Sequence, residues 1–162
     1  MKTSSSRCPW SKMVITTTIV CTTLLLTLAG YLLYLYKCGY NEISTLYVAI
    51  LFFIVIFAAF AITPLRVRVD DKGITIRLML GRKFIPRDEI KEIRPFNKER
   101  FTVRLLGSGG LFGFTGWFRN REIGVFSALA TDLDKSYIIR RKSQCPIMIS
   151  VTDPSIFNEI RK

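Results

Sequence analysis

The sequence MVITTTIVCTTLLLTLAGYLLYLY (residues 13–36) is followed after six residues by ISTLYVAILFFIVIFAAFAITPL (residues 43–65), and neither stretch contains a charged side chain. Each is longer than the ~20 residues that a helix needs to cross the hydrocarbon core of a bilayer. The first stretch stays bulky beyond Ala29-Gly30, which is not typical of a signal peptide cleavage site. We therefore expect two transmembrane helices, over residues 13–36 and 45–64.

The segment between the two spans, residues 37–44, is short enough to serve only as an extracytoplasmic turn. The spans then form an antiparallel hairpin, and both chain termini lie on one side of the membrane. Basic residues flank the spans on that side: Lys2, Arg7, Lys12, Arg66 and Arg68. The positive-inside rule places both termini in the cytoplasm, at the inner (plasma) membrane. Residues 1–12 are expected to be a basic cytoplasmic tail.

Residues 65–162 differ in composition and are expected to form one small cytoplasmic domain. After residue 63 the chain has 20 Lys and Arg against 11 Asp and Glu, a net +9 of the chain's +12. Residues 66–70 and 74–80 alternate between polar and apolar side chains on either side of a turn, Asp71-Lys72-Gly73, which predicts a β-hairpin. Further strands are expected at residues 83–86, 90–95, 101–106, 122–130, 137–142 and 147–151.

The strand pattern favours an all-β domain, a sandwich or partly open barrel of about seven strands. The chain ends in a different pattern. Asp153-Pro154 combines a helix N-cap residue with proline at the first helical position, and Ile156, Phe157 and Ile160 follow at helical spacing. This predicts an amphipathic C-terminal helix that closes the domain.

Specific residues resemble those of the bacterial PH-like (pleckstrin-homology-like) domain family. They are Gly107-Ser108-Gly109-Gly110-Leu111-Phe112-Gly113-Phe114-Thr115-Gly116-Trp117-Phe118-Arg119-Asn120, Ala130-Thr131-Asp132-Leu133-Asp134, and Asp153-Pro154 with Phe157. The resemblance covers residues 65–161. It implies a PH-like fold, which in this family often follows membrane spans, and it implies no activity, ligand or catalytic residue.

The glycine–aromatic segment, residues 107–120, is the first candidate interaction site, because exposed aromatic side chains in loops often serve binding. Its candidate residues are Gly107, Gly109, Gly110, Phe112, Phe114, Trp117 and Phe118. We expect the aromatic rings either to fold inward and plug the barrel, which we favour, or to dip into the headgroup region. A phosphate-binding loop is disfavoured because no glycine here is followed by Lys and Ser or Thr.

Basic side chains form the second candidate site, a contact with the anionic inner leaflet. The residues selected are Arg66, Arg68, Arg82 and Lys83. The competing interpretation is a solvated strand face, and it is the stronger one for Arg77 and Arg104 because they alternate with apolar neighbours. Nucleic acid is not expected as a partner, since no binding motif accompanies the charge.

Enzymatic chemistry has little support in the sequence, and we expect no catalytic residue, metal or cofactor. The chain has no histidine, and its four cysteines lack the spacing of a metal site. Asp132 and Asp134 are typical of a turn.

The sequence therefore predicts a membrane α-helical hairpin that carries one PH-like domain, which acts as a non-catalytic interaction or regulatory module. Its partners are expected to be the bilayer, in which it is integral, and a protein of unknown identity. The alternatives are an anionic-lipid-sensing domain and an accessory subunit of a membrane enzyme or transporter. Binding of lipid by basic residues would weaken with salt, whereas a strand-edge contact would persist.

Overall fold

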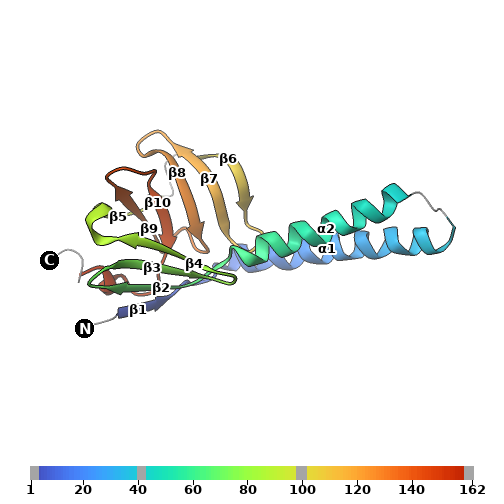
Figure 1. Cartoon of the computed structure of the whole chain (residues 1–162), viewed down its shortest axis with the longest axis horizontal. Helices are drawn as coiled ribbons and strands as arrows, with labels where there is room; N and C mark the ends of the chain where they lie inside the picture. Colours follow the sequence, from blue (N-terminus) through green and yellow to red (C-terminus); the bar gives the residue numbers. More distant parts are fainter. Residues whose placement is uncertain (1–3, 40–42, 98–101, 159–162) are drawn as a thin grey trace.

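A computed structural model describes residues 4–39, 43–97 and 102–158. A β domain lies at one end of the molecule, and two long helices project from it side by side (Figure 1). They are α1 (Lys12–Lys37) and α2 (Ile43–Ala61). The Ser11 side chain accepts a hydrogen bond from the Val14 N–H at 3.2 Å and so caps the start of α1.

Both helices are long and apolar enough to span a membrane. Only 17% of the apolar window of α1 and 6% of that of α2 are buried inside the protein. A helix in the core of a soluble domain would be mostly buried, whereas these two are mostly exposed. Helix α2 ends at Ala61, and the chain is already a strand from Pro64.

The first sheet has the strand order β1-β2-β3-β4, and all its pairs are antiparallel. The strands are β1 (Ser4–Arg7), β2 (Pro64–Asp70), β3 (Gly73–Leu78) and β4 (Arg82–Pro86). Strands β2 and β3 confirm the predicted hairpin. Strand β1 lies within the segment expected to be a tail, and it adds an edge strand to the sheet although it precedes α1 in the chain.

The second sheet has the order β5-β9-β10-β8-β7-β6, in which only β10 and β8 run parallel. The strands are β5 (Ile90–Pro95), β6 (Thr102–Gly109), β7 (Phe114–Asn120), β8 (Gly124–Ala130), β9 (Ser136–Arg141) and β10 (Ile147–Ser150). The single-turn helix η1 (Arg87–Glu89) joins β4 to β5. Two open sheets with this β-rich content agree with the predicted PH-like fold, although the described residues form ten strands where about seven were expected.

The two sheets pack face to face over a core of branched aliphatic side chains, among them Val67, Ile76, Ile139 and Ile149, all fully buried. Alternation along β2 and β3 places such residues inward and polar residues outward. A second cluster covers the opposite face of the second sheet around Phe126, and Val14 at the start of α1 belongs to it. The domain core thus extends to the base of the helical hairpin.

The C-terminal segment differs from its prediction. Within the described residues it is the four-residue 3₁₀ helix η2 (Pro154–Phe157), and the expected amphipathic α-helix is not seen there; Ile160 lies outside the described residues. Asp153 does act as the cap, accepting from the Ser155 N–H at 2.9 Å. Ile156 and Phe157 are both buried, and the Phe157 ring packs 5.2 Å from that of Tyr137. This packing holds the short helix against the sandwich.

The glycine–aromatic segment is a β-hairpin rather than a loop, because Gly107 and Gly109 belong to β6 and β7 begins at Phe114. The turn between the strands is closed by a hydrogen bond from the Gly110 N–H to the Gly113 carbonyl, 3.0 Å long. Phe114 and Phe118 are buried in the second core cluster, whereas Trp117 on the other face is half-exposed.

Candidate functional site

Strand register aligns four arginines across the first sheet. Arg7 on β1 is paired with Arg66 on β2, Arg66 with Arg77 on β3, and Arg77 with Arg82 on β4. We call these four residues the arginine row. Each pairing is between directly opposite positions, so the four side chains start from the same level of the sheet. Arg68 lies two positions further along β2.

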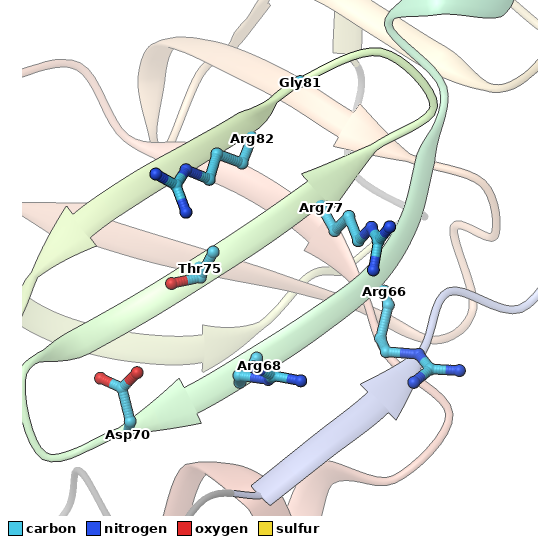
Figure 2. A pocket seen from close by; sticks show the side chains of 7 residues that line it. All are labelled: Arg66, Arg68, Asp70, Thr75, Arg77, Gly81 and Arg82. Carbon is cyan, nitrogen blue, oxygen red and sulfur yellow. The ribbon is translucent and has the colours of Figure 1, made fainter.

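The arginine row lies on the outer face of the sheet, because the alternate residues Val67 and Ile76 are buried on the inner face. There the side chains border a hollow of about 600 Å³ (Figure 2). Its lining residues are Arg66, Arg68, Asp70, Thr75, Arg77, Gly81 and Arg82. An adjoining hollow of about 380 Å³ is lined by Arg7, Leu65, Arg66 and Arg77.

The positive charge of the arginine row is not neutralised by nearby acids. Where both partners are described residues, the only ion pair joins Arg94 and Glu92 on β5. Asp70 is the single acid in the hollow, and its carboxylate accepts hydrogen bonds from the N–H groups of Lys72 and Gly73. Like charges placed directly opposite each other destabilise a sheet. The row therefore costs stability in the free protein, and a bound anion would offset that cost.

Arginine suits such a role, because its planar guanidinium offers paired N–H donors that match phosphate and carboxylate oxygens. Four such groups at one level can contact several phosphates at once. The arrangement is suited to the recognition of negative charge.

The arginine row lies at the end of the sheet nearest the helices. Arg66 follows the end of α2 by five residues, and strands β2, β3 and β4 lie along the long axis of the molecule, on the side of the helical hairpin's base (Figure 1). The turn between β3 and β4 is tied to the end of α2 by two 2.9 Å hydrogen bonds, from the Met79 N–H to the Thr63 carbonyl and from the Leu80 N–H to the Ala61 carbonyl.

Lys83, the fourth basic residue selected from the sequence, lies outside the hollow. It precedes buried Ile85 by two positions and follows Arg82, so it points to the inner side of β4. Burial lowers the pKa of its ammonium group, and the charge of Arg141 on the second sheet lowers it further. The arginine row instead includes Arg7 and Arg77, which the sequence analysis did not select.

The β6–β7 hairpin is joined to both helices through its turn. The Thr18 hydroxyl on α1 donates to the Gly110 carbonyl at 3.2 Å and accepts from the Phe112 N–H at 2.9 Å. The Phe112 ring meets Phe60 of α2 edge to face, with centroids 5.7 Å apart. The candidate residues Gly110 and Phe112 thus join the domain to the two helices.

No metal-binding arrangement is present within the described ranges, where no three His, Cys, Asp or Glu residues come together. The four cysteines are free thiols, of which Cys8 is buried and Cys38 and Cys145 are exposed. Asp132 and Asp134 form a turn, in which the Asp134 N–H donates to the Asp132 carboxylate at 3.0 Å.

The fold is that of a two-sheet β domain joined to an apolar helical hairpin, with an arginine-rich outer face. Residues 65–162 match the family described as Bacterial PH domain, so the chain belongs to that family and the resemblance seen in its sequence is confirmed. The matched region begins in β2 and leaves out β1 and both helices. No curated protein and no solved structure matches the chain.

Proposed function

We propose that this protein is a non-catalytic interaction module, anchored in the plasma (inner) membrane with its PH domain in the cytoplasm, and that the arginine row binds the phosphates of anionic lipids. The observation that carries the proposal is the row itself, four directly aligned arginines without acidic partners among the described residues. Of the partners expected from the sequence, anionic lipid is the one this surface fits best.

The position of the row favours a lipid surface. A row across strands runs perpendicular to them, and the strands follow the direction of the helices (Figure 1). The four arginines then stand at one height above a membrane that the helices cross. Lipid phosphates also lie in one layer, and each basic side chain near an anionic surface contributes about 1 kcal/mol. The helices hold the row at that layer, so binding needs no diffusion from solution.

The pairing of β1 with β2 supports the proposed topology. Strand β1 precedes α1 and β2 follows α2, and antiparallel pairing of Ser4–Arg7 with residues 66–69 requires both ends of the hairpin to lie on one side. Arg7, Lys12, Arg66 and Arg68 are all on that side, which is the cytoplasmic side by the positive-inside rule. Cleavage of α1 as a signal peptide would also remove an edge strand of the sheet.

Cysteine labelling tests this topology. In single-cysteine variants, a membrane-impermeant maleimide added to intact cells is expected to label Cys38, which is exposed beyond the end of α1. Cys145 should react only after the membrane is opened. Cys8 should stay unlabelled until the domain is unfolded, because burial raises its pKa to about 12 and keeps the thiol neutral. Labelling of Cys145 in intact cells would place the domain outside.

Neutralising the arginine row tests its function. In Arg66→Gln/Arg77→Gln, two of the four charges are lost, and at ~1 kcal/mol each the affinity for anionic lipid is expected to fall about 30-fold. The measurement is native mass spectrometry of the full chain in neutral detergent, titrated with short-chain phosphatidylglycerol and, separately, with phosphatidylcholine.

The matched control is Lys91→Gln/Arg121→Gln, which removes the same charge from exposed positions on β5 and in the β7–β8 turn. This variant should keep its preference for phosphatidylglycerol. Equal losses in the two variants would show that net charge alone attracts the lipid. No loss in either variant would refute the proposed lipid site.

A further inference from the structure

Strand β6 exposes an unusual amount of apolar surface for the edge of a sheet. Leu106 is 71% exposed, Leu105 51%, and Val103 and Trp117 43% each. Trp117 lies directly opposite Leu106 on the neighbouring strand, and a register irregularity between Arg104 and Leu106 leaves both leucines outside the core. We call Val103, Leu105, Leu106 and Trp117 the β6 face.

An edge strand with this much exposed apolar surface is prone to aggregation in water. Within the part of the chain that the structure describes, no strand pairs with the outer side of β6. Exposed, apolar edge strands tend to pair with other chains. Proteins usually protect edges with charged side chains, but here the exposed positions alternate with only one basic residue, Arg104. The β6 face is therefore expected to be covered in the working protein.

The location of β6 indicates what covers it. Along the long axis of the molecule, β6 is the strand of its sheet nearest to the helices (Figure 1). Its turn with β7 contacts Thr18 and Phe60, which lie within the two apolar helices. The β6 face thus continues the apolar surface of the helical hairpin on the domain side.

We propose that the β6 face rests in the headgroup layer of the same membrane that the helices cross, and so fixes the orientation of the domain. This inference rests on the proposed membrane anchoring, but not on lipid binding by the arginine row. Trp and Leu gain from burial at the boundary between water and hydrocarbon. Backbone groups on the outer edge of residues 103–109 can be hydrated in the headgroup layer, whereas water could not reach them deeper in the bilayer.

A basic side chain on β7 lies on the same side of the sheet as Trp117 and fits this layer. Arg119 is exposed and is paired with Val103, whereas Arg104 is paired with Phe118 and belongs to the other side of the sheet. Long arginine side chains can cover apolar surface while their guanidinium groups reach lipid phosphates. Pairing of β6 with β6 of a second copy is the main alternative, and the experiments below separate the two.

Tryptophan fluorescence in liposomes that contain brominated lipids tests the proposal. The chain has two tryptophans, so Trp10→Phe leaves Trp117 as the reporter. Two reference variants carry Trp10→Phe and Trp117→Phe with one new tryptophan each, at Phe53 in the middle of α2 or at Asp71 in the β2–β3 turn far from the helices. Trp117 is expected to emit at shorter wavelength than the Asp71→Trp reporter, and to be quenched most by bromines close to the headgroup.

The two reference variants distinguish failure of this inference from failure of the proposed membrane anchoring. If Phe53→Trp is quenched and Trp117 is not, the helices cross the membrane and the β6 face does not touch it, which overturns this inference alone. If neither is quenched, the anchoring fails as well. A photo-crosslinking side chain at Leu106, with both native tryptophans kept, gives a second measurement. Adducts with phospholipid support the inference, and adducts with a second copy of the chain overturn it.

Discussion

Gly116→Ala is expected to destabilise the domain by about 4 kcal/mol, because β6 and β7 approach each other more closely at this point than a side chain allows. A Cβ on Gly116 would lie 2.2 Å from the Leu106 carbonyl oxygen and 2.7 Å from the Cα of Gly107. The residue also has a φ of +126°, in a region that L-amino acids rarely adopt. The backbone strain and the steric clash both destabilise the folded state. Their sum is a large part of the free energy of unfolding of a typical domain, about 5–15 kcal/mol.

The measurement is urea unfolding of the full chain in mild detergent, followed by tryptophan emission. Gly109→Ala in the neighbouring strand β6 is the control. Gly109 does not have a positive φ, and its Cβ would meet only the end of the flexible Arg104 side chain, 2.8 Å away. This variant should unfold at nearly the same urea concentration as the natural protein. If Gly116→Ala and the natural protein unfolded at the same urea concentration, β6 and β7 would not approach each other this closely at Gly116.

The same glycines show why the sequence predicted this segment incompletely. Five glycines among residues 107–116 lower the strand propensity, and the segment was expected to be a loop. In the structure Gly107 and Gly116 lie opposite each other and let two strands pair closely. Local propensity disfavours this conformation, and only the pairing of the two strands selects it.

The two helices and the β2–β3 hairpin could be predicted because their signals are local: length and hydropathy for the helices, alternation around Asp71-Lys72-Gly73 for the hairpin. Strand β1 could not be predicted in this way. The residues Ser4-Ser5-Ser6-Arg7 show no apolar alternation, and their pairing partners follow some 60 residues later, after both helices. The Cys8 N–H bond to the Leu65 carbonyl, 3.0 Å long, extends this non-local contact.

Some residues of the arginine row could be predicted from local sequence signals, and others depend on non-local strand pairing. Arg66 and Arg68 were selected from the sequence for their closeness to the second span. Arg77 could also have been found, because the turn at Asp71-Lys72 sets the hairpin register that places it opposite Arg66. Arg7 depends on the non-local strand β1. Lys83 is adjacent to Arg82 in sequence, but the two-residue period of a strand sends its side chain to the other face.

The second large effect is expected at Ser150, where one buried hydroxyl supports the junction between the domain and α1. The Ser150 Oγ accepts hydrogen bonds from the N–H groups of Thr131 and Asp132, at 3.1 and 3.0 Å, and donates to the Asp132 carbonyl at 2.7 Å. All these groups are buried. Thr131 in turn holds the chain that enters α1: its hydroxyl donates to the Pro9 carbonyl, and its carbonyl accepts from the Ser11 N–H.

Ser150→Ala leaves two buried N–H donors without an acceptor, and each such loss costs 1–3 kcal/mol, so we expect a destabilisation of about 3 kcal/mol. Ser136→Ala should cost less, about 1 kcal/mol. The Ser136 hydroxyl bonds only to the Asp132 carbonyl and to the Ser150 hydroxyl, and these two groups still bond to each other in the variant. Ser5→Ala, at an exposed position of β1, should change stability by no more than ~0.5 kcal/mol.

Urea unfolding measures the global effect of these variants, and alkylation of Cys8 reports on the junction itself. Cys8 lies between β1 and α1 and is buried. It reacts only when this region opens, so a loss of about 3 kcal/mol raises its alkylation rate by roughly a hundredfold if opening is global. A rise in Cys8 reactivity without a change in the urea midpoint would instead show that Ser150 stabilises the entry to α1 locally. Unchanged values of both would show that the hydroxyl is dispensable and that water satisfies the two N–H groups.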